Sequence, residues 1–462
     1  MGMKITVLGG GGVRAPLLVA SLLRRAGRIH LDEVALMDVD AERLDLMGDL
    51  CRAIGGWLGS PVRISTSLAA RSALEGAAYV ITTLRVGQEH GRVLDERIAL
   101  RHGVLGQETT GPGGFAMAVR SIPEILKYAE LAGAVCPGAW IFNFTNPAGL
   151  VTQALRDSGY SRVVGICDGA NLAQRDAAAY LHVPPRSLKA EVFGLNHLSW
   201  TRRLWQEDRD LLPSLLADQR FLASSTQQMF DRELVQQMGL FLNEYLYYFY
   251  SADQAVAQIQ GDELTRGEEV EQLNAKLIRA LKAVNIPANP DEAFQVYAGY
   301  ERRRSATYMH YARPDAPDMR AADSAAREAA GFALDEGEGY AGVALDIIEA
   351  FETGEPVYTA LNVPNQGSIA RMRPEDVVEI SCRVDREGIH PLPIGEIPEA
   401  QELLMRQVKL YERRAVEAIL ERSRQKAALA LIAHPLVLSY PLARTLVDEY
   451  LRAHAAFAGE WS

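Results

Sequence analysis

Residues 3–16 read MKITVLGGGGVRAP, and this stretch predicts how the first half of the chain folds. The apolar run at 3–8 contains β-branched residues and favours a buried strand. Four consecutive glycines follow, and the segment LLVASLLRRAG after them has the apolar spacing of a helix. A strand, a glycine-rich turn and a helix in this order form the setting in which a glycine motif binds a dinucleotide.

The glycines fit the dinucleotide motif in two registers, and only the register that ends at Ala15 keeps the third small residue. In either register, backbone N–H groups at a helix N-terminus can bind a pyrophosphate. Asp38 lies near the end of the next predicted strand, 33–39, where an acid binds a ribose diol and disfavours a 2′-phosphate. The expected cofactor is therefore NAD, and the alternative is a purely structural glycine turn. The expected cofactor contacts are Gly9, Gly10, Gly11, Gly12, Val13, Arg14 and Asp38.

Strand-like and helix-like segments alternate as far as residue 170, with further strands expected at AYVITTL, WIFNF and RVVGIC. This alternation is typical of a doubly wound parallel sheet. The predicted fold class is therefore α/β, with a Rossmann-like NAD-binding domain over residues 1–190.

The pattern changes after residue 190. EVFGLNHLSW is interpreted as strands of a new sheet. Helical blocks are expected next, at 226–250, 268–284, 325–337 and 339–354, and a β segment at 356–395 precedes a helical end. An α+β domain is therefore predicted over residues 191–462, and we expect it to hold substrate and metal and to form a homodimer or homotetramer. The stretch 285–320, rich in Pro, Asp and Arg, is expected to be the least regular.

The composition excludes several classes of function. The chain has 48% hydrophobic and 23% charged residues, as in an ordinary globular protein, and its formal net charge is −11. An acidic chain is unsuited to nucleic acid or to an anionic membrane surface, so neither is expected as a partner. There is no apolar run of signal-peptide or membrane-spanning length, and the four cysteines are too scattered for a disulfide framework. A cytoplasmic location is expected.

The segment 85–126 is dense in side chains that hold sugars, among them Arg85, Gln88, Arg92, Asp95, Glu96, Gln107, Glu108 and Thr109. It contains the polar, glycine-rich motif GQETTGPGG, which is typical of a binding loop. Four further motifs follow in order: NFTNPAGLVTQAL, VVGICDGA, FGLNHLSW and EISCRVDREGIHPLPIG. In these motifs the chain resembles glycoside hydrolase family 4 along nearly its whole length, and within that family the 6-phospho-glucosidases, mainly through GQETTGPGG.

This resemblance implies an enzyme that depends on NAD and on a divalent metal ion, with Mn²⁺ the ion expected. Cys167 and His197 match the metal ligands. From chemistry alone, the pair equally fits a buried thiol and a core histidine, and a thiolate is an unusual ligand for a hard ion such as Mn²⁺. The expected substrate contacts are Arg92, Glu108, Asn146 and Asn196.

The resemblance also implies a mechanism by oxidation and elimination. NAD⁺ takes hydride from carbon 3 of the sugar, which acidifies the proton on carbon 2 with the help of the metal. Tyr245 in YLYYFY is the candidate base, with Tyr248 as second choice and an aromatic core face as the alternative. Asp168 is the candidate acid for the leaving group, or else a support for the metal. Water then adds, and the hydride returns to the sugar.

Two departures from the family pattern bear on the substrate. Cys167-Asp168-Gly169-Ala170 lacks the usual proline, and Asp168 suggests an α-linkage where other segments suggest a β-linkage. A segment that normally carries a phosphate-binding arginine reads DEGEGYA at 335–341. Because carboxylates repel a phosphate dianion, we expect weak or no preference for a 6-phosphorylated sugar. The run Arg302–Arg304 could replace that arginine, or could be a solvated surface.

Two other hypotheses fit the N-terminal half. The first is a malate- or lactate-like dehydrogenase, which would need a catalytic His–Asp pair, no metal cysteine, and stoichiometric release of NADH. The second is an NAD-responsive sensor or binding protein, which would bind the cofactor without turnover.

Overall fold

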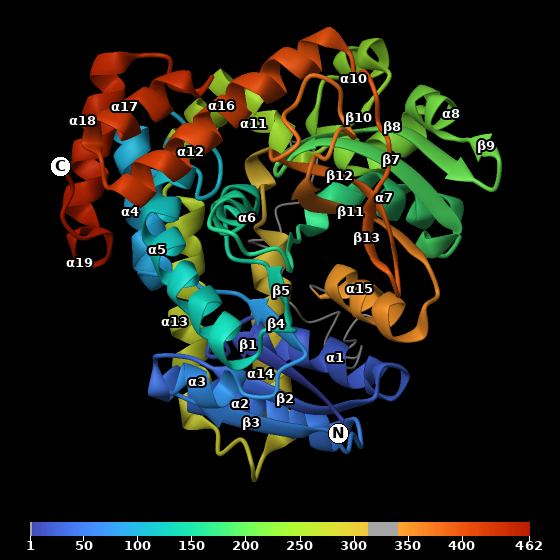
Figure 1. Ribbon diagram of the computed structural model, residues 1–462, viewed down its shortest axis with the longest axis vertical. Helices are drawn as coiled ribbons and strands as arrows, with labels where there is room; N and C mark the ends of the chain where they lie inside the picture. Colours follow the sequence, from blue (N-terminus) through green and yellow to red (C-terminus); the bar gives the residue numbers. More distant parts are fainter. Residues whose placement is uncertain (1, 313–340) are drawn as a thin grey trace.

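The computed structural model describes residues 2–312 and 341–462, and a nine-stranded sheet runs through this part of the chain (Figure 1). Six of its strands are parallel and follow the order β3-β2-β1-β4-β5-β6, which is the order of a doubly wound dinucleotide-binding fold. Their bounds are β1 Met3–Leu8, β2 Leu31–Met37, β3 Arg63–Ser67, β4 Tyr79–Thr82, β5 Trp140–Asn143 and β6 Val163–Gly165. The predicted fold class is confirmed, although the short, polar strand β3 was not predicted.

Three late strands complete the same sheet: β11 Val357–Pro364, β12 Val377–Asp385 and β13 Gly388–Pro391. They are antiparallel, and β11 joins the edge of β6 where Asn362 pairs with Gly165. The β segment expected at 356–395 therefore extends the N-terminal sheet, and the division into domains at residue 190 stays a prediction. Without β11, β6 would be the edge strand of the parallel part of the sheet, and its outer N–H and C=O groups would be unpaired. Strand β11 supplies a hydrogen-bonding partner at this edge.

A smaller antiparallel sheet contains β7 Leu188–Leu195, β8 Leu198–Gln206, β9 Arg209–Asp210 and β10 Phe241–Leu242. This confirms that EVFGLNHLSW begins a new sheet. The Ser381 hydroxyl on β12 joins the two sheets, because it accepts from the Val192 N–H at 2.8 Å and donates to the Ala190 carbonyl at 2.8 Å.

Helices cover both sheets. Those of the N-terminal half are α1 Ala15–Ile29, α2 Ala41–Trp57, α3 Ala70–Leu74, α4 Gln88–Arg101, α5 Pro112–Val135, α6 Ala148–Asp157 and α7 Leu172–Leu181. Those of the middle are α8 Leu212–Ala217, α9 Gln219–Ser224, α10 Arg232–Met238, α11 Tyr247–Tyr250, α12 Ala252–Gly261, α13 Arg266–Ala283, α14 Pro290–Ala306 and α15 Gly342–Thr353. The chain ends with α16 Glu399–Glu421, α17 Arg424–Ala433, α18 Tyr440–Ala453 and α19 Ala455–Ala458.

Two local predictions need correction. The block 226–250 is not one helix, because β10 and a 3₁₀ turn at Glu244–Leu246 interrupt it before α11. The described part of the stretch 285–320, which ends at residue 312, is less irregular than expected, because α14 begins at Pro290, where a proline is compatible with the first turn of a helix. The helix expected at 325–337 lies outside the described residues.

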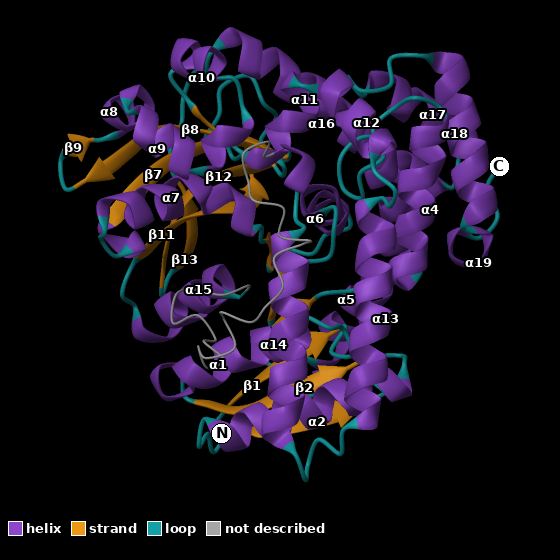
Figure 2. Cartoon of the chain, turned by 180° about the vertical axis from the view of Figure 1, so that it is seen from behind, coloured by secondary structure: helices purple, strands orange, loops and turns teal. Residues whose placement is uncertain are grey.

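Helices α13 and α14 pack together beside the parallel sheet and connect it to the upper part of the molecule (Figure 2). Tyr297 on α14 is buried and donates to the Val13 carbonyl in the glycine turn at 2.8 Å. Glu301, one turn further along, pairs with Arg14 at 2.6 Å. Helix α14 therefore holds the glycine turn from the outside. In the described part of the chain, no helix combines the length and the apolar character that crossing a membrane requires.

Candidate active site

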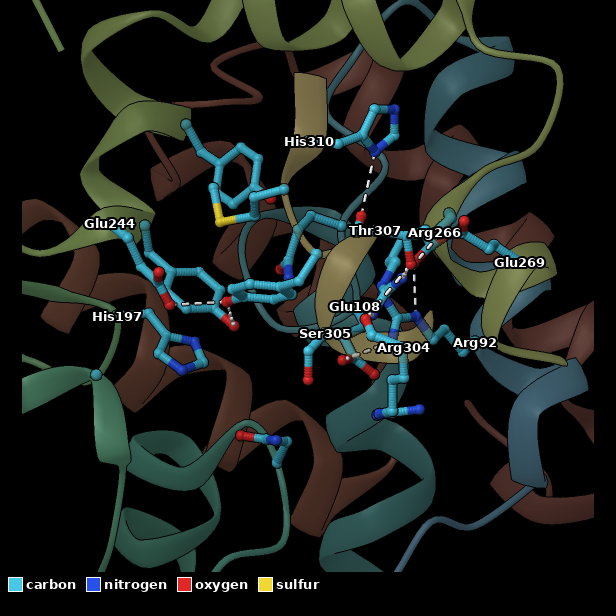
Figure 3. Close-up of a pocket in the computed structure, with 18 of the residues that line it drawn as sticks. Arg92, Glu108, His197, Glu244, Arg266, Glu269, Arg304, Ser305, Thr307 and His310 are labelled. Atoms are coloured by element: carbon cyan, nitrogen blue, oxygen red, sulfur yellow. Dashed lines mark hydrogen bonds and ion pairs between the residues drawn. The ribbon is translucent and has the colours of Figure 1, made fainter. Parts of the chain in front are cut away.

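A cavity of about 460 Å³ lies at the carboxyl ends of the parallel strands, where open α/β sheets bind ligands. Its walls come from the loops after β4, β5 and β6, from the β7–β8 turn, from residues 244–248 and from residues 304–311. Figure 3 shows His197 and Glu244 on one side of this cavity and Arg92, Glu108 and Arg304 on the other. Of the predicted residues, the cavity brings together Arg14, Arg92, Glu108, Asn146, Cys167, Asp168, His197, Tyr245 and Tyr248.

His197 is the second residue of the two-residue turn between β7 and β8. Its φ is 63°, a left-handed backbone conformation that costs free energy in a non-glycine residue and that clusters at functional sites. The imidazole is buried, and its ring stacks flat on Tyr245 with 3.7 Å between the ring centroids. The strained turn thus places the imidazole between the sheet and the predicted base.

The hydrogen bonds around His197 indicate which ring nitrogen is free. The Thr109 hydroxyl lies 2.9 Å from Nδ1 of His197 and can donate its own proton to the Gln107 Oε1 at 3.0 Å. His197 then carries its proton on Nδ1 and keeps a lone pair on Nε2, the arrangement found in metal-ligating histidines. Burial lowers the His197 pKa to about 4, so the imidazole is neutral at neutral pH. Thr109 and Gln107 had been predicted only as general sugar-binding groups.

Cys167 follows β6 and begins the 3₁₀ turn Asp168–Asn171. Burial raises the pKa of its thiol well above the ordinary value, and the nearby Glu379 and Asp168 raise it further. A thiolate here therefore needs a cation beside it. A thiol, a neutral imidazole and several carboxylates around one cavity suit a divalent metal ion, so the donor set fits the predicted metal.

Tyr245 lies in the 3₁₀ turn before α11, with its ring stacked on His197, and its role as the base stays a prediction. Burial raises the pKa of Tyr245, and the Glu244 carboxylate raises it further. The residues around it therefore do not activate the phenol, and bound positive charge is needed to do so. The Tyr248 ring packs edge-on against Tyr245, and its hydroxyl is hydrogen-bonded to Tyr311 at 2.5 Å.

Sequence reasoning missed Tyr308. Its hydroxyl lies 2.8 Å from Oε1 of Glu244 and 3.2 Å from the Tyr245 hydroxyl, so it connects the predicted base to a carboxylate. The segment that carries it, just after α14, had been predicted to be irregular and gave no signal of function.

The far side of the cavity holds paired arginines. Arg92 is buried and bonds Glu96 at 2.7 Å and Glu108 at 2.9 Å, while Arg85 bonds Glu108 at 2.5 Å. Burial alone would raise the Glu108 pKa, but Arg85 and Arg92 bring it to about 2. Glu108 is thus a fixed anion that can accept hydrogen bonds from sugar hydroxyls.

Asn196 occupies a different place from the one expected. Its carbonyl oxygen accepts from the Gly149 N–H at 3.2 Å, and its amide donates to Glu379 at 3.3 Å. It does not line the cavity, whereas Asn146 does. Glu379 is buried, and burial raises its pKa to about 7 although Ser199 and Asn196 donate to it. The structure thus places Asn196 behind the His197 turn, where it anchors the turn to β12; substrate contact by Asn196 stays a prediction.

The glycine turn has the geometry that the dinucleotide motif needs. Gly9 has a φ of 95°, and a Cβ there would lie 2.8 Å from the Thr83 carbonyl oxygen. The Gly11 N–H donates to the Asp38 carboxylate at 2.9 Å, so the turn and the end of β2 meet as expected. Gly10 and Gly12 complete the turn, and Arg14 connects it to the cavity wall. These residues fit a dinucleotide, and their contacts with one stay a prediction.

Within the described residues, one group of three potential metal ligands lies elsewhere, at Asp385, Glu387 and His390 in the β12–β13 hairpin. Arg383 already pairs with Asp385 at 2.6 Å, and the Glu387 N–H caps the same carboxylate. Local turn contacts therefore account for this cluster.

Comparison with known families agrees with this geometry. The pattern described as Family 4 glycosyl hydrolase matches residues 4–183, and the Family 4 glycosyl hydrolase C-terminal domain matches residues 192–437. The chain belongs to glycoside hydrolase family 4. A dehydrogenase or a sensor would not account for the match over the C-terminal half, so the two other hypotheses are set aside.

Individual relatives of this family 4 chain match it over nearly their full length. It is 28% identical to a probable 6-phospho-beta-glucosidase of Bacillus subtilis over 99% of this chain and 97% of that protein. It is 29% identical to the 6-phospho-beta-glucosidase of Escherichia coli over 98% and 95%. The 6-phospho-beta-glucosidase of Thermotoga maritima, solved with manganese, NAD⁺ and glucose-6-phosphate, superposes with a TM-score of 0.81, at 27% identity over 98% and 99%.

Proposed function

We propose that this family 4 enzyme hydrolyses a glycoside by oxidation and elimination, using NAD⁺ and a divalent metal ion, Mn²⁺ being the ion expected. The observation that carries the proposal is the meeting of Cys167, Asp168, His197 and Tyr245 in one cavity beside a dinucleotide-type turn. The Thermotoga relative solved with manganese and NAD⁺ supports the choice of cofactors.

Bound NAD⁺ would supply a hydride acceptor at carbon 3, and a metal held by Cys167 and His197 would supply positive charge at the neighbouring oxygens. Tyr245 takes the proton from carbon 2, and its stacking on His197 keeps it next to the metal ligands. Glu108 and Asn146 bind sugar hydroxyls and orient the ring, since both line the cavity.

Asp168 gives a proton to the leaving oxygen on carbon 1. Burial raises its pKa to about 6, while Arg175 and Arg14 lower it and keep it from rising further. A carboxylic acid with a pKa near the working pH suits general acid catalysis, because a useful fraction carries the proton. Arg175 also donates to the Asp168 carbonyl at 3.1 Å and so holds this turn in place.

Activity is expected to require both added NAD⁺ and a divalent metal, and to disappear on chelation. The reason is that the thiol of Cys167 and the phenol of Tyr245 both have raised pKa values in the protein alone. The measurement is release of aglycone by the stripped enzyme, with NAD⁺ and Mn²⁺ restored singly and together. Full activity in the chelated, cofactor-free enzyme would exclude the proposal.

We propose a 6-phosphorylated glucoside as the substrate, because relatives that match nearly the whole chain are named for such substrates. The sequence had instead favoured a weak preference for the 6-phosphate. Asp335, Glu336 and Glu338, on which it rests, lie outside the described residues. In the cavity, Arg85, Arg92 and Arg266 already pair with glutamates. Arg304 lines the cavity and, within the described residues, pairs with no carboxylate, whereas Arg302 and Arg303 are exposed. Arg175 also lines the cavity and donates to the Asp168 backbone carbonyl, so two guanidiniums there form no ion pair with a carboxylate of the described residues and can bind a phosphate dianion.

The specificity constants for matched glucosides with and without a 6-phosphate are therefore expected to differ by more than about tenfold in favour of the phosphorylated form, because one charge-assisted bond contributes about 1.5 kcal/mol or more. Equal specificity constants for the two glucosides would contradict this prediction. Arg304→Ala, compared with Arg303→Ala as an exposed control, would show whether Arg304 holds the phosphate.

A further inference from the structure

We propose that Asn243 positions the predicted metal ligands and the predicted base relative to one another, although it does not itself line the cavity. Asn243 directly follows β10, which pairs with β8, and its N–H donates to the Ser199 carbonyl at 3.1 Å. The residue is buried, so its side chain acts through protein groups and not through contact with substrate. This role rests on the proposed function, since Cys167 and His197 are taken as the metal ligands.

The amide of Asn243 contacts the turn that carries Cys167. Its nitrogen donates to the Gly169 carbonyl, two residues after the cysteine, at 3.1 Å. A Cβ on Gly169 would lie 3.4 Å from that nitrogen and 3.5 Å from the Cys167 Sγ, so the amide and the sulfur pack against the same small residue. The hydrogen bond therefore fixes the Cys167 turn at a point close to the sulfur.

The same side chain caps the turn that carries Tyr245. Its carbonyl oxygen accepts from the Tyr245 N–H at 3.0 Å, which satisfies a backbone group left free at the start of a helical turn. Turning the amide over would set its oxygen against the Gly169 carbonyl and its nitrogen against the Tyr245 N–H, so these contacts select one orientation. One amide thus holds the Cys167 turn by its donor and the Tyr245 turn by its acceptor.

A chain of buried hydrogen bonds continues from Asn243 to the His197 turn. The Asn243 amide also donates to the Ser199 hydroxyl at 3.2 Å, and this hydroxyl donates to Oε2 of Glu379 at 2.7 Å. The other oxygen of Glu379 accepts from Asn196, the residue before His197, at 3.3 Å. Each donor in this chain meets an acceptor, and a fully satisfied buried network makes the local structure rigid.

The predicted metal ligands come from different sheets. Cys167 follows β6 of the large sheet, and His197 lies in the β7–β8 turn of the small one. A metal ion that binds both needs their donor atoms at a fixed spacing, and the hydrogen bonds of Asn243 join the two turns before the ion arrives. Groups that hold metal ligands in place typically contribute about 10–100-fold to metal affinity.

Asn243→Ser tests this role in the full-length enzyme. Serine is a favourable N-cap residue and can still cap the Tyr245 turn, but its single short hydroxyl cannot bridge Gly169 and Ser199 as the amide does. Mn²⁺ affinity, read from the EPR signal of the ion without substrate, is expected to fall at least about tenfold. Wild-type affinity in Asn243→Ser would overturn the role and leave the proposed function standing. A wild-type enzyme that binds no Mn²⁺ would contradict both.

Asn365→Ser is the matched control. Asn365 is buried, its amide donates to the Ile369 and Met372 carbonyls, and its oxygen accepts from a backbone N–H. It lies after β11 and does not line the cavity. Both variants lose a comparable buried amide and should lose stability, whereas Mn²⁺ affinity should fall only in Asn243→Ser. An equal fall in Asn365→Ser would point to general loosening and overturn the role.

The reactivity of Cys167 gives a second measurement that needs no metal. Of the four cysteines, Cys51, Cys136 and Cys382 are buried and Cys167 is only partly buried, so a thiol reagent should reach Cys167 first. Its rate in the metal-free enzyme is identified by comparison with Cys167→Ser. In Asn243→Ser we expect a rate about three- to tenfold higher, because a hydrogen bond that holds the turn closed is lost. An unchanged rate would overturn the role even in an enzyme that binds Mn²⁺.

Discussion

Cys167→Ser and His197→Ala are each expected to lower turnover by about 10³-fold or more while leaving NAD⁺ affinity almost unchanged. Loss of a metal ion removes several kcal/mol of stabilisation of developing charge, and about 4 kcal/mol corresponds to 10³-fold. Cys167 and His197 line the cavity. The glycine turn and Asp38 form a separate part of the site, joined by the Gly11–Asp38 hydrogen bond. Turnover, bound metal and calorimetric NAD⁺ affinity are the three measurements.

Cys136→Ser is the matched control, because Cys136 is also a free cysteine but lies in the core at the end of α5. It should keep wild-type turnover and metal content. Wild-type rates in Cys167→Ser or His197→Ala would remove that residue from the site. Loss of NAD⁺ binding in either variant would show that the two halves of the site are not independent.

Tyr245→Phe is expected to slow turnover by about 10²–10⁴-fold, the usual contribution of a general base. The substitution removes only the hydroxyl, and the stacking on His197 at 3.7 Å can persist. In deuterated water, the wild type should place deuterium on carbon 2 of the product, because the proton removed there is replaced from solvent. The position of deuterium is read by NMR.

Tyr248→Phe is the matched control on the next turn. Its ring packs against Tyr245 and not on the predicted metal ligand His197, so the loss of its hydroxyl should affect turnover far less. Product without deuterium at carbon 2 would exclude the elimination mechanism itself. An unchanged rate in Tyr245→Phe combined with a slow Tyr248→Phe would transfer the base to Tyr248.

The features that could be predicted from sequence are those that depend on residues close together in the chain. The glycine turn after β1 and the acid after β2 are local patterns, and the alternation of strands and helices dictates a parallel sheet. The order β3-β2-β1-β4-β5-β6 agrees with that prediction, and the family motifs named a metal pair and a base that the structure brings into one cavity. Strand β3 was not predicted, because its sequence RISTS is short and only partly buried.

Only the tertiary structure decided which distant segments meet. Strand β11 joins β6, although almost two hundred residues separate them, because the edge of β6 needs a hydrogen-bonding partner. Tyr308 reaches Tyr245 because α14 folds back over the glycine turn, and Asn196 is turned away from the cavity by Gly149 and Glu379. No periodicity encodes such contacts, since they depend on the packing of whole elements. Sequence alone thus determined the kind of sheet and the chemistry at its edge, while packing decided which side chains face the cavity.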